Sequence, residues 1–529
     1  MKVVYFFIVY FLHRSQGYNG SAGPNRDKIV ACYYTSWAAY RPGLGSFDIS
    51  DIEPTLCSHL IYSFVGLDEN SFKIKHIDQW QDLEKDGGKG GLKRIVALKE
   101  KHKHLKIIVS IGGWNEGSAK YSKMAGDPKL RNVFVKSAVN FLTIHNLDGL
   151  DLFWDHPTKR GGVPEDRNNY VSLIKELSEA FEPKGFLLTG SLRSNSGEMN
   201  SLYNLEHVNY YLDFLHIMGY EFHGSWDEVI GANAPLHGKD EGDTLNVEYT
   251  IKYLLKLGVT PNKIILNLPL FGKTYILTNP GVKGIVYGET ATKAVGFSGP
   301  FTAEDGFMGY NEICLELANK TSQWVEGWHE RSNTPYLWDD DRFISYDNPR
   351  SIANKVAFAL DHGIGGFAAW TITTDDFRGS CDEEMDTYKD FIERYNKISD
   401  QQLMKRALNS LLEAGNKIDH FVAVDDKVRL QLPKATFSNY PLLRTIHDAT
   451  NIVLEGAKIL KEMEKLKGQA QAKPQTDIQK DRIPCIRTCT EICYYGLVNS
   501  EMNKMQRSKR TIINYKYVKP SIFKNAPLL

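Results

Sequence analysis

Short apolar runs alternate with longer amphipathic segments along the first three quarters of the chain. Runs of this length, bounded by polar residues, are typical of buried strands in a parallel sheet. Eight such runs occur, at residues 28–36, 59–67, 106–114, 149–154, 186–193, 213–221, 263–273 and 365–372. The segments between them have helical periodicity, as in residues 131–146 and 167–185. Eight strands, each followed by a helix, predict an α/β fold of the (β/α)8 TIM-barrel type.

Two segments depart from this alternation. A stretch rich in Gly and aromatic residues separates the seventh run from the helix predicted at 349–363, and it is too long for a barrel loop. We therefore expect a small α+β insertion at about residues 274–340. After residue 395 the pattern changes to amphipathic helices and a polar linker. The barrel is predicted to span residues 28–395, and residues 396–529 to form a mainly helical, low-order extension that the barrel does not need.

The N-terminal segment has the pattern of a secretory signal peptide. Lys2 precedes an apolar run from Val3 to Leu12, which is too short to span a bilayer. We expect residues 1–20 to be a signal peptide and the protein to be secreted and extracellular, with no membrane attachment. A membrane anchor or a buried strand is the alternative interpretation. In a secreted chain, the Asn-Lys-Thr sequon makes Asn319 the expected glycosylation site.

The charge balance narrows the choice of partners. Lys+Arg and Asp+Glu both total 64 in 529 residues. Nucleic-acid-binding proteins usually carry a basic surface, so we expect no nucleic-acid partner.

Several predicted strands end in an aromatic residue. These residues are Trp37, Trp114, Trp154, Tyr220 and Trp370, with Trp226 on the loop after the sixth strand. The chemistry of a TIM barrel sits at the C-terminal ends of its strands, and aromatic rings pack against the apolar faces of sugar rings. The pattern indicates a sugar-binding groove; the alternative is that these residues belong to the core.

The fourth run carries a cluster of acids. Residues 148–155 read D-G-L-D-L-F-W-D, which places Asp148, Asp151 and Asp155 around an apolar run. Carboxylates in a buried strand are costly unless they are paired or have a chemical role. The stretch therefore indicates either the acid cluster of an enzyme or the remains of one.

Four ordered motifs carry a resemblance to a known family. They are SIGGW (110–114), MGYEFHGSW (218–226), YNEIC (310–314) and GGFAAWTITTDDFRGSC (365–381). At these residues the sequence resembles glycoside hydrolase family 18, and most closely the secreted chitinases and chitinase-like proteins of arthropods. The resemblance implies a TIM barrel that binds chitin or chito-oligosaccharides, and we expect neither a metal nor a cofactor.

The resemblance also implies two disulfides, Cys32–Cys57 and Cys314–Cys381. The chain has seven cysteines, and the remaining three crowd the tail at Cys485, Cys489 and Cys493. An odd cysteine is then left over, so an intermolecular disulfide through the tail is a further expectation.

The catalytic motif of the family is altered in this chain. Active members resemble D-G-x-D-x-D-W-E, which Asp148 and Asp151 match. Phe153 replaces the aspartate that orients the substrate's acetamido group, and Asp155 replaces the glutamate that protonates the leaving oxygen. Tyr220 matches the family tyrosine that donates to the acetamido oxygen. A displacement of about 1 Å can cost on the order of 10²-fold in rate, so a side chain shorter by one methylene predicts impaired catalysis.

Two further positions depart from the family. The resemblance implies that the substrate-binding residues are Trp37, Trp114, Met218, Glu221, Trp226, Lys273 and Trp370. Glu221 stands where the family has Asp, and Lys273 where it commonly has Arg; lysine keeps the charge but lacks the planar fork. The polar residues have changed at four positions, whereas the tryptophans remain.

Three hypotheses follow. The first is a secreted chitinase-like protein that binds chitin or N-acetylglucosamine oligomers in an aromatic groove, with hydrolysis lost or strongly impaired. The second is a weakly active chitinase that uses Asp155 as its acid. The third is a secreted signalling or immune-modulating protein with a vestigial groove.

Overall fold

The computed structural model describes most of the first three quarters of the chain and one short segment beyond it. The described residues are 28–281, 284–319, 321–381, 439–451 and 453–454. Contacts divide the chain into two units, and the first, residues 1–401 with 429–456, contains every described residue. The signal peptide predicted at residues 1–20 and the tail cysteines lie outside the described residues, as does most of the predicted extension.

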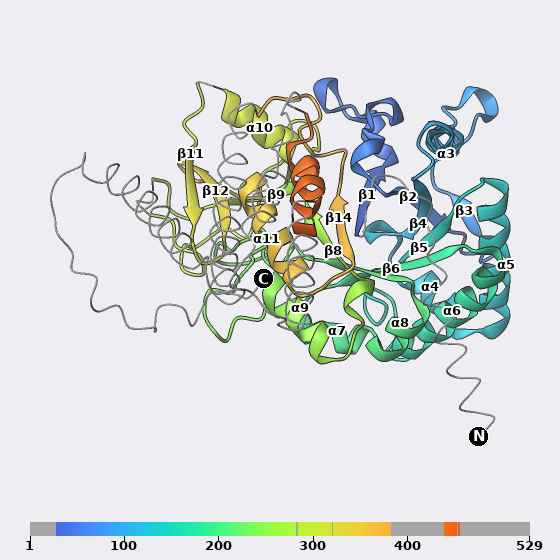
Figure 1. Cartoon of the computed structure of the whole chain (residues 1–529). Helices are drawn as coiled ribbons and strands as arrows, with labels where there is room; N and C mark the ends of the chain where they lie inside the picture. The colour runs from blue at the N-terminus through green and yellow to red at the C-terminus, as the bar shows by residue number, and fades with distance from the viewer. Residues whose placement is uncertain (1–27, 282–283, 320, 382–438, 452, 455–529) are drawn as a thin grey trace, which may run out of the picture. The chain divides into compact units, whose positions relative to one another are not determined.

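Eight parallel strands form a closed barrel (Figure 1). In spatial order they are β1 (Ile29–Thr35), β14 (Gly366–Trp370), β8 (Ile264–Pro269), β7 (Phe214–Met218), β6 (Leu187–Arg193), β5 (Gly149–Phe153), β4 (Lys106–Gly112) and β2 (His59–Leu67). The barrel closes because β1 pairs with both β14 and β2. All eight strands fall within the eight predicted runs, and the predicted TIM barrel is confirmed.

One predicted run covers two elements. The run at 263–273 contains β8 and the start of β9 (Phe271–Ile276), which belongs to a different sheet. The chain changes sheet at Leu270, whose amide donates to the Trp370 carbonyl. Because Leu270 is as buried as its neighbours, the apolar pattern carries no sign of this break.

Alternate residues of the barrel strands face two separate cores. On β1, Ile29, Ala31 and Tyr33 belong to a cluster whose buried members all come from barrel strands. The residues between them, Val30 and Cys32 among them, belong to the larger cluster formed with the helices. Side chains of a strand alternate between its faces, and both faces of the barrel strands are buried, which explains the nearly continuous apolar runs.

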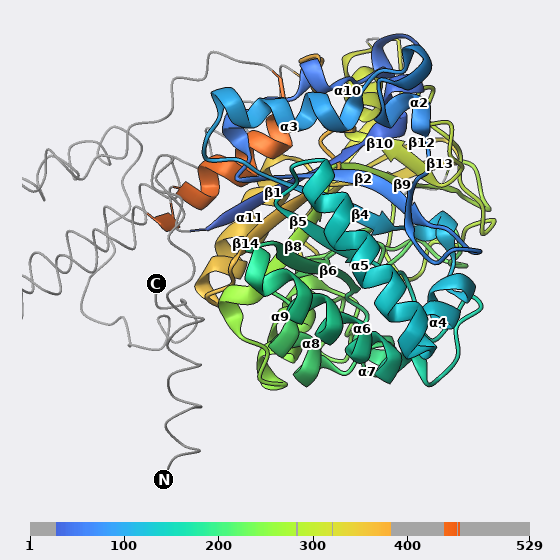
Figure 2. The same cartoon turned by 90° about the vertical axis from the view of Figure 1, so that its right-hand side faces the viewer.

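Helices surround the barrel, and Figure 2 shows α5, α6, α8 and α9 side by side on its outer face. The helices of this part are α2 (Gln79–Asp82), α3 (Gly91–Lys101), α4 (Ala119–Gly126), α5 (Pro128–Ile144), α6 (Asp166–Phe181), α7 (Ser196–Leu202), α8 (Leu205–Tyr211), α9 (Val247–Lys256) and α11 (Pro349–Asp361). A short strand, β3 (Ile74–His76), pairs antiparallel to β2. Among the described residues, no helix combines the length and the apolar character needed to cross a membrane.

An antiparallel sheet with one helix follows β8. Its strands are ordered β10 (Phe307–Gly309), β9, β13 (Arg342–Ser345), β12 (Thr334–Asp339) and β11 (Val325–His329), and its helix is α10 (Tyr310–Ala318). This is the α+β insertion, and it extends a few residues beyond the predicted bounds of 274–340 on each side.

A helical segment from the predicted extension packs on the barrel. Residues 441–451 are helical and drawn in orange-red in Figure 1. The amides of Leu442 and Leu443 donate to the carboxylate of Asp375, which follows β14. Leu442, Leu443 and Ile446 are buried in the larger core cluster. Part of the segment that we expected the barrel not to need therefore contributes to its core.

Candidate functional site

A buried carboxylate lies inside the barrel, on β5. Asp151 accepts hydrogen bonds from four hydroxyl groups of three other strands, those of Tyr33 (3.1 Å), Ser110 (2.7 Å), Thr189 (2.8 Å) and Ser191 (3.2 Å). The Tyr33 hydroxyl also lies 2.7 Å from Nδ1 of His216. Hydroxyl donors solvate the carboxylate without a countercharge, so the cost of burying it is offset by hydrogen bonds.

Asp148 lies at the other end of the same strand. It precedes β5, accepts a hydrogen bond from the Ile107 amide at 2.8 Å and lies 3.0 Å from the Lys99 ammonium. Seven residues of extended chain span about 20 Å, so Asp148 and Asp155 are far apart. Asp148 and Asp155 are therefore close in the motif but separated in the structure. Asp148 has a structural role at the N-terminal end of β5.

We call the C-terminal ends of the eight parallel strands, with the loops that follow them, the barrel mouth. Phe153 is the last residue of β5 and belongs to an apolar cluster at this mouth. The buried members of the cluster are Phe153, Met218, Tyr220, Ala234 and Phe271. The Phe153 ring lies edge-on to Phe64 at 5.3 Å between centroids and 5.5 Å from Trp370. Phe153 is thus part of an apolar floor at the barrel mouth.

Tyr220 places a hydroxyl group in this floor. The side chain is buried, and its hydroxyl lies beside Asn267 of β8. Neither this hydroxyl nor the side-chain amide of Asn267 makes a hydrogen bond of ordinary geometry. Burial raises the pKa of Tyr220 well above its usual range, so the hydroxyl keeps its proton. A buried donor and a buried amide without partners provide specific polar contacts for a ligand.

Asp155 forms a bidentate ion pair. Its two oxygens accept from Nε and Nη2 of Arg193 at 2.8 and 2.7 Å. Nδ1 of His156 lies 2.8 Å from Oδ1. Burial acts to raise the pKa of Asp155, but hydrogen bonds from Arg193 and His156 outweigh it and hold the pKa well below its usual range. Asp155 is therefore an anion at any physiological pH.

The ion pair continues across the mouth. Nη1 of Arg193 donates to Oε2 of Glu221 at 2.8 Å. The other carboxylate oxygen of Glu221 lies 2.9 Å from the Lys273 ammonium. Burial acts to raise the pKa of Glu221, and the charges of Lys273 and Arg193 outweigh it and bring the pKa to about 2. Four side chains thus form a chain of alternating charge with no net charge.

Three exposed tryptophans surround this floor. The exposed fractions are 44% for Trp37, 56% for Trp114 and 55% for Trp226. Trp37 stacks on Phe64, Trp114 lies edge-on to His156, and the Lys273 ammonium lies 5.3 Å from the Trp226 ring. Trp370 is half-buried and packs against Tyr33 and Phe153.

Trp154 does not belong to the mouth. Its side chain is 1% exposed, packs between Tyr121 and Tyr170, and donates to the Ser118 hydroxyl. Side chains alternate along a strand, so Trp154 points toward the helices because its neighbour Phe153 points toward the mouth. For Trp154 the core interpretation was the correct one.

Sequence reasoning missed Arg193, although it ends a predicted strand. The signal was available, because residues at the C-terminal ends of barrel strands reach the active site. Arg160 was missed as well: its guanidinium lies 3.5 Å from the centre of the Trp114 ring. No pattern pointed to it, because it lies on an irregular loop.

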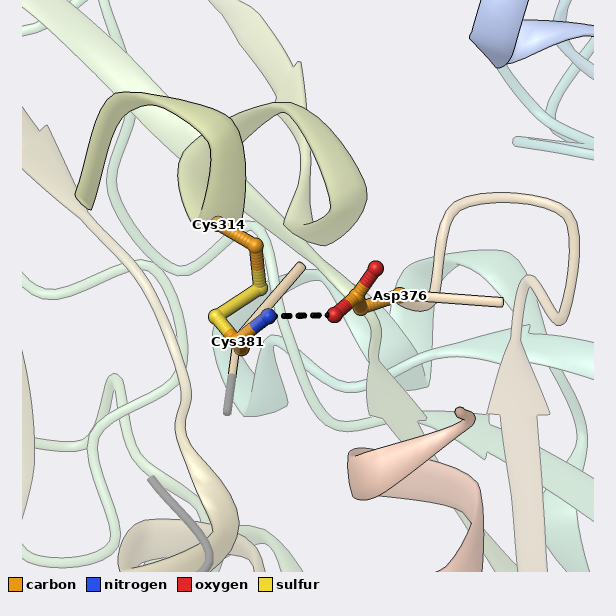
Figure 3. A group of neighbouring side chains, drawn as sticks. All are labelled: Cys314, Asp376 and Cys381. Atoms are coloured by element: carbon orange, nitrogen blue, oxygen red, sulfur yellow. Dashed lines mark hydrogen bonds between the residues drawn. A yellow bond between two sulfur atoms is a disulfide. The ribbon is translucent and has the colours of Figure 1, made fainter. Parts of the chain in front are cut away.

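One group of side chains has the spacing of a metal site. Figure 3 shows Cys314, Asp376 and Cys381, whose ligand atoms lie within 4.8 Å of one another. The two sulfur atoms are bonded to each other, so neither is a free thiolate, and the Asp376 carboxylate accepts from the Cys381 amide at 2.7 Å. The donor set does not fit a metal ion. The group is one of the two expected disulfides, and Cys32–Cys57 is the other.

Comparisons with known proteins agree with the fold. The family model described as "Glycosyl hydrolases family 18" matches residues 29–375. Probable chitinase 2 of Drosophila melanogaster is 39% identical over 469 residues, which cover 87% of this chain and 86% of that protein. The Ostrinia furnacalis Group IV chitinase in complex with allosamidin has a TM-score of 0.64 at 36% identity, covering 69% of this chain and 99% of that one. Human YKL-39, described as a pseudo-chitinase with retained chitooligosaccharide binding properties, has a TM-score of 0.61 at 30% identity, covering 67% and 96%.

Proposed function

The chain belongs to glycosyl hydrolase family 18, and we propose that it binds chitin or N-acetylglucosamine oligomers at the barrel mouth with hydrolysis lost or strongly impaired. The observation that carries the proposal is the state of Asp155, whose two oxygens are both hydrogen-bonded to Arg193. A general acid must hold a proton and present it to the leaving oxygen. A buried carboxylate fixed as an anion by a bidentate guanidinium does neither.

The apolar floor supports the same conclusion. Family 18 hydrolysis uses the substrate's own acetamido group as the nucleophile, and the resemblance assigns its orientation to an aspartate. Phe153 stands at that position, packed against Phe64 and Trp370. A phenyl ring accepts no hydrogen bond from the acetamido N–H, so the nucleophile is neither oriented nor polarised.

The rim of the mouth supports retained binding. Trp37, Trp114 and Trp226 expose about half of their surface, and such rings pack against sugar faces. Tyr220 supplies a buried hydroxyl donor suited to an acetamido oxygen. The similar YKL-39 is described as a pseudo-chitinase that retains chitooligosaccharide binding. Binding without hydrolysis is therefore compatible with this fold.

A weakly active chitinase is the second candidate. It would use Asp155 as its acid, since this residue keeps a titratable carboxyl at the family position. It would require Asp155 to leave Arg193 and take up a proton during the reaction, against the charges that lower its pKa.

A secreted signalling or immune-modulating protein with an unused mouth is the third candidate. It shares with the first the proposed secretion and the proposed glycan at Asn319. Asn319 directly follows α10 and is exposed, and its side-chain oxygen accepts from the Thr321 hydroxyl at 2.7 Å. The Asn319 side chain is therefore accessible to modification in the folded chain.

Retention on chitin beads tests the proposal, combined with hydrolysis of a fluorogenic chitobioside. We expect the purified protein to be retained and to release no fluorophore. Trp226→Ala should weaken retention, whereas Tyr249→Ala, which removes an exposed aromatic ring from α9, should not. Absence of retention would favour the third candidate, and steady fluorophore release the second.

A further inference from the structure

Arg193 is held rigidly at the barrel mouth by two carboxylates. Its three nitrogen atoms donate to Asp155 and Glu221 at 2.7–2.8 Å. Glu221 is itself held by Lys273. The planar guanidinium matches a carboxylate at both of its oxygens, a geometry that lysine does not reproduce. The side chain is only 17% exposed, so water competes little for these contacts.

The position of Arg193 determines what would happen if Phe153 and Asp155 were changed back to the family residues. A glutamate at position 155 would be longer by one methylene, but its carboxylate would emerge beside the same guanidinium. Because Arg193 also donates to Glu221, its guanidinium would stay beside position 155. A restored glutamate would then be paired as Asp155 is, with both oxygens occupied.

We propose that Arg193 is a third inactivating residue, a lock on position 155 that keeps the protein inactive even when the two motif changes are reversed. The inference rests on the proposed function, because it assumes that the mouth still binds chito-oligosaccharides. Arg193 acts through residue 155 and contacts no reacting atom, so it is a positioning residue. Its removal frees one carboxylate oxygen to carry the proton and to reach the leaving oxygen.

The test compares three variants in hydrolysis of a fluorogenic chitobioside. The first is Phe153→Asp with Asp155→Glu, and the second adds Arg193→Ala. The third adds Arg167→Ala to the first, which removes a guanidinium that donates to the Asn200 carbonyl and not to residue 155. We expect the first and third to stay at the background of the native protein, and the second to exceed them by about 10²-fold, the lower range for a working general acid.

The conservative variant Arg193→Lys shows whether Arg193 acts on residue 155 or only supports the fold. With both motif positions reversed, Arg193→Lys keeps a charge but loses the fork. We expect intermediate turnover, and an alkaline limb of the pH profile of kcat/KM at lower pH than with Arg193→Ala, because a remaining cation lowers the pKa of the acid. This limb does not move if Arg193 serves only to support the fold.

Binding measurements keep the two proposals distinguishable. Calorimetric titration of every variant with chitohexaose shows whether the mouth is intact; loss of binding in the native protein contradicts the proposed function and not the lock. The lock is overturned if the first variant hydrolyses as fast as the second. It is also overturned if the second variant folds and binds chitohexaose but remains as inactive as the first.

Discussion

The barrel interior and the barrel mouth hold two carboxylates four residues apart in very different surroundings. Asp151 is surrounded by hydroxyl groups from three other strands, and Asp155 is paired with a guanidinium and an imidazole. The interior carboxylate is held by neutral donors, whereas the carboxylate at the mouth is held by cations. The difference indicates that Asp151 supports the barrel, whereas Asp155 belongs to the charged network at the mouth.

The largest effect is expected inside the barrel. Asp151→Ala removes the carboxylate that accepts from four buried hydroxyl groups, and hydrogen bonds to a charged group contribute about 1.5–3 kcal/mol each. Two of these hydroxyl groups, those of Tyr33 and Ser191, keep another partner, which reduces the loss. We expect a loss of about 5 kcal/mol in the free energy of unfolding, measured by urea denaturation. The control is Asp148→Ala on the same strand, where the carboxylate is partly exposed and the loss should be about 1 kcal/mol. Equal losses would contradict the division between the interior and the rest of the strand.

A third carboxylate, Asp375, extends the comparison because it has neither hydroxyl groups nor a cation among its described contacts. It accepts from the amides of Asp376, Leu442 and Leu443. Burial raises the pKa of Asp375 to about 7, above the value of about 3.9 in an unfolded chain. The folded state therefore binds this proton more tightly, and the stability it contributes is complete below about pH 4 and is lost as the pH rises to 7.

Asp375→Asn removes this titration while keeping an acceptor oxygen for the helix at 441–451. The unfolding free energy of the variant relative to the native protein should rise between pH 4 and pH 7, by up to about 4 kcal/mol at about 1.4 kcal/mol for each unit of pKa. If the unfolding free energies of the two proteins, measured by chemical denaturation, changed in parallel with pH, the pKa of Asp375 would not be raised by folding.

The ion pair at the mouth should contribute less than the interior. Arg193→Met leaves Asp155 buried without this cation and should cost about 3 kcal/mol at pH 7, the lower end for breaking a buried ion pair. Asp155→Asn with Arg193→Met should recover most of this loss, giving a coupling energy of about 2 kcal/mol in a double-mutant cycle. The depressed pKa of Asp155 means that its stabilising contribution is present above about pH 4 and is lost as the pH falls further. Simple additivity of the two variants would show that the pair is not coupled.

The smallest effect concerns the rim. Trp37→Ala removes an exposed ring that stacks on Phe64. We expect the affinity for chitohexaose to fall about tenfold, equivalent to about 1.4 kcal/mol, with an unchanged melting temperature. Tyr249→Ala on the outer helix α9 should leave the affinity as it is. An equal fall in both would mean that the rim is not the binding surface.

The barrel could be predicted from the sequence because its signal is local. Each strand is an apolar run buried on both faces, and each run is bounded by polar residues. The join between β8 and β9 was missed because Leu270 is apolar and buried like its neighbours. The contact of the helix at 441–451 with the barrel could not be predicted, because a long stretch of sequence separates this helix from β14. The hydrogen bonds of Asp375 and Asp376 show the contact.

The candidate site could be predicted only in part. Phe153, Asp155, Tyr220, Trp37 and Trp114 were predicted from their places at or just after strand ends, and Trp226 from its place on the loop after the sixth strand. Asp148 was grouped with them because it is near in sequence, although strand geometry places it at the opposite end of β5. The partner of Asp155 was missed because Arg193 lies 38 residues away, on another strand, and pairing across strands is set by the closed barrel.

Calorimetric titration of the native protein with chitohexaose tests the central claim most directly, because one trace reports both binding and turnover. We predict saturable binding to one site per chain, with the heat signal returning to a flat baseline after each injection. A continuing heat signal after each injection would show hydrolysis, and the absence of any binding heat at several temperatures would show that the mouth no longer binds; either result contradicts the account.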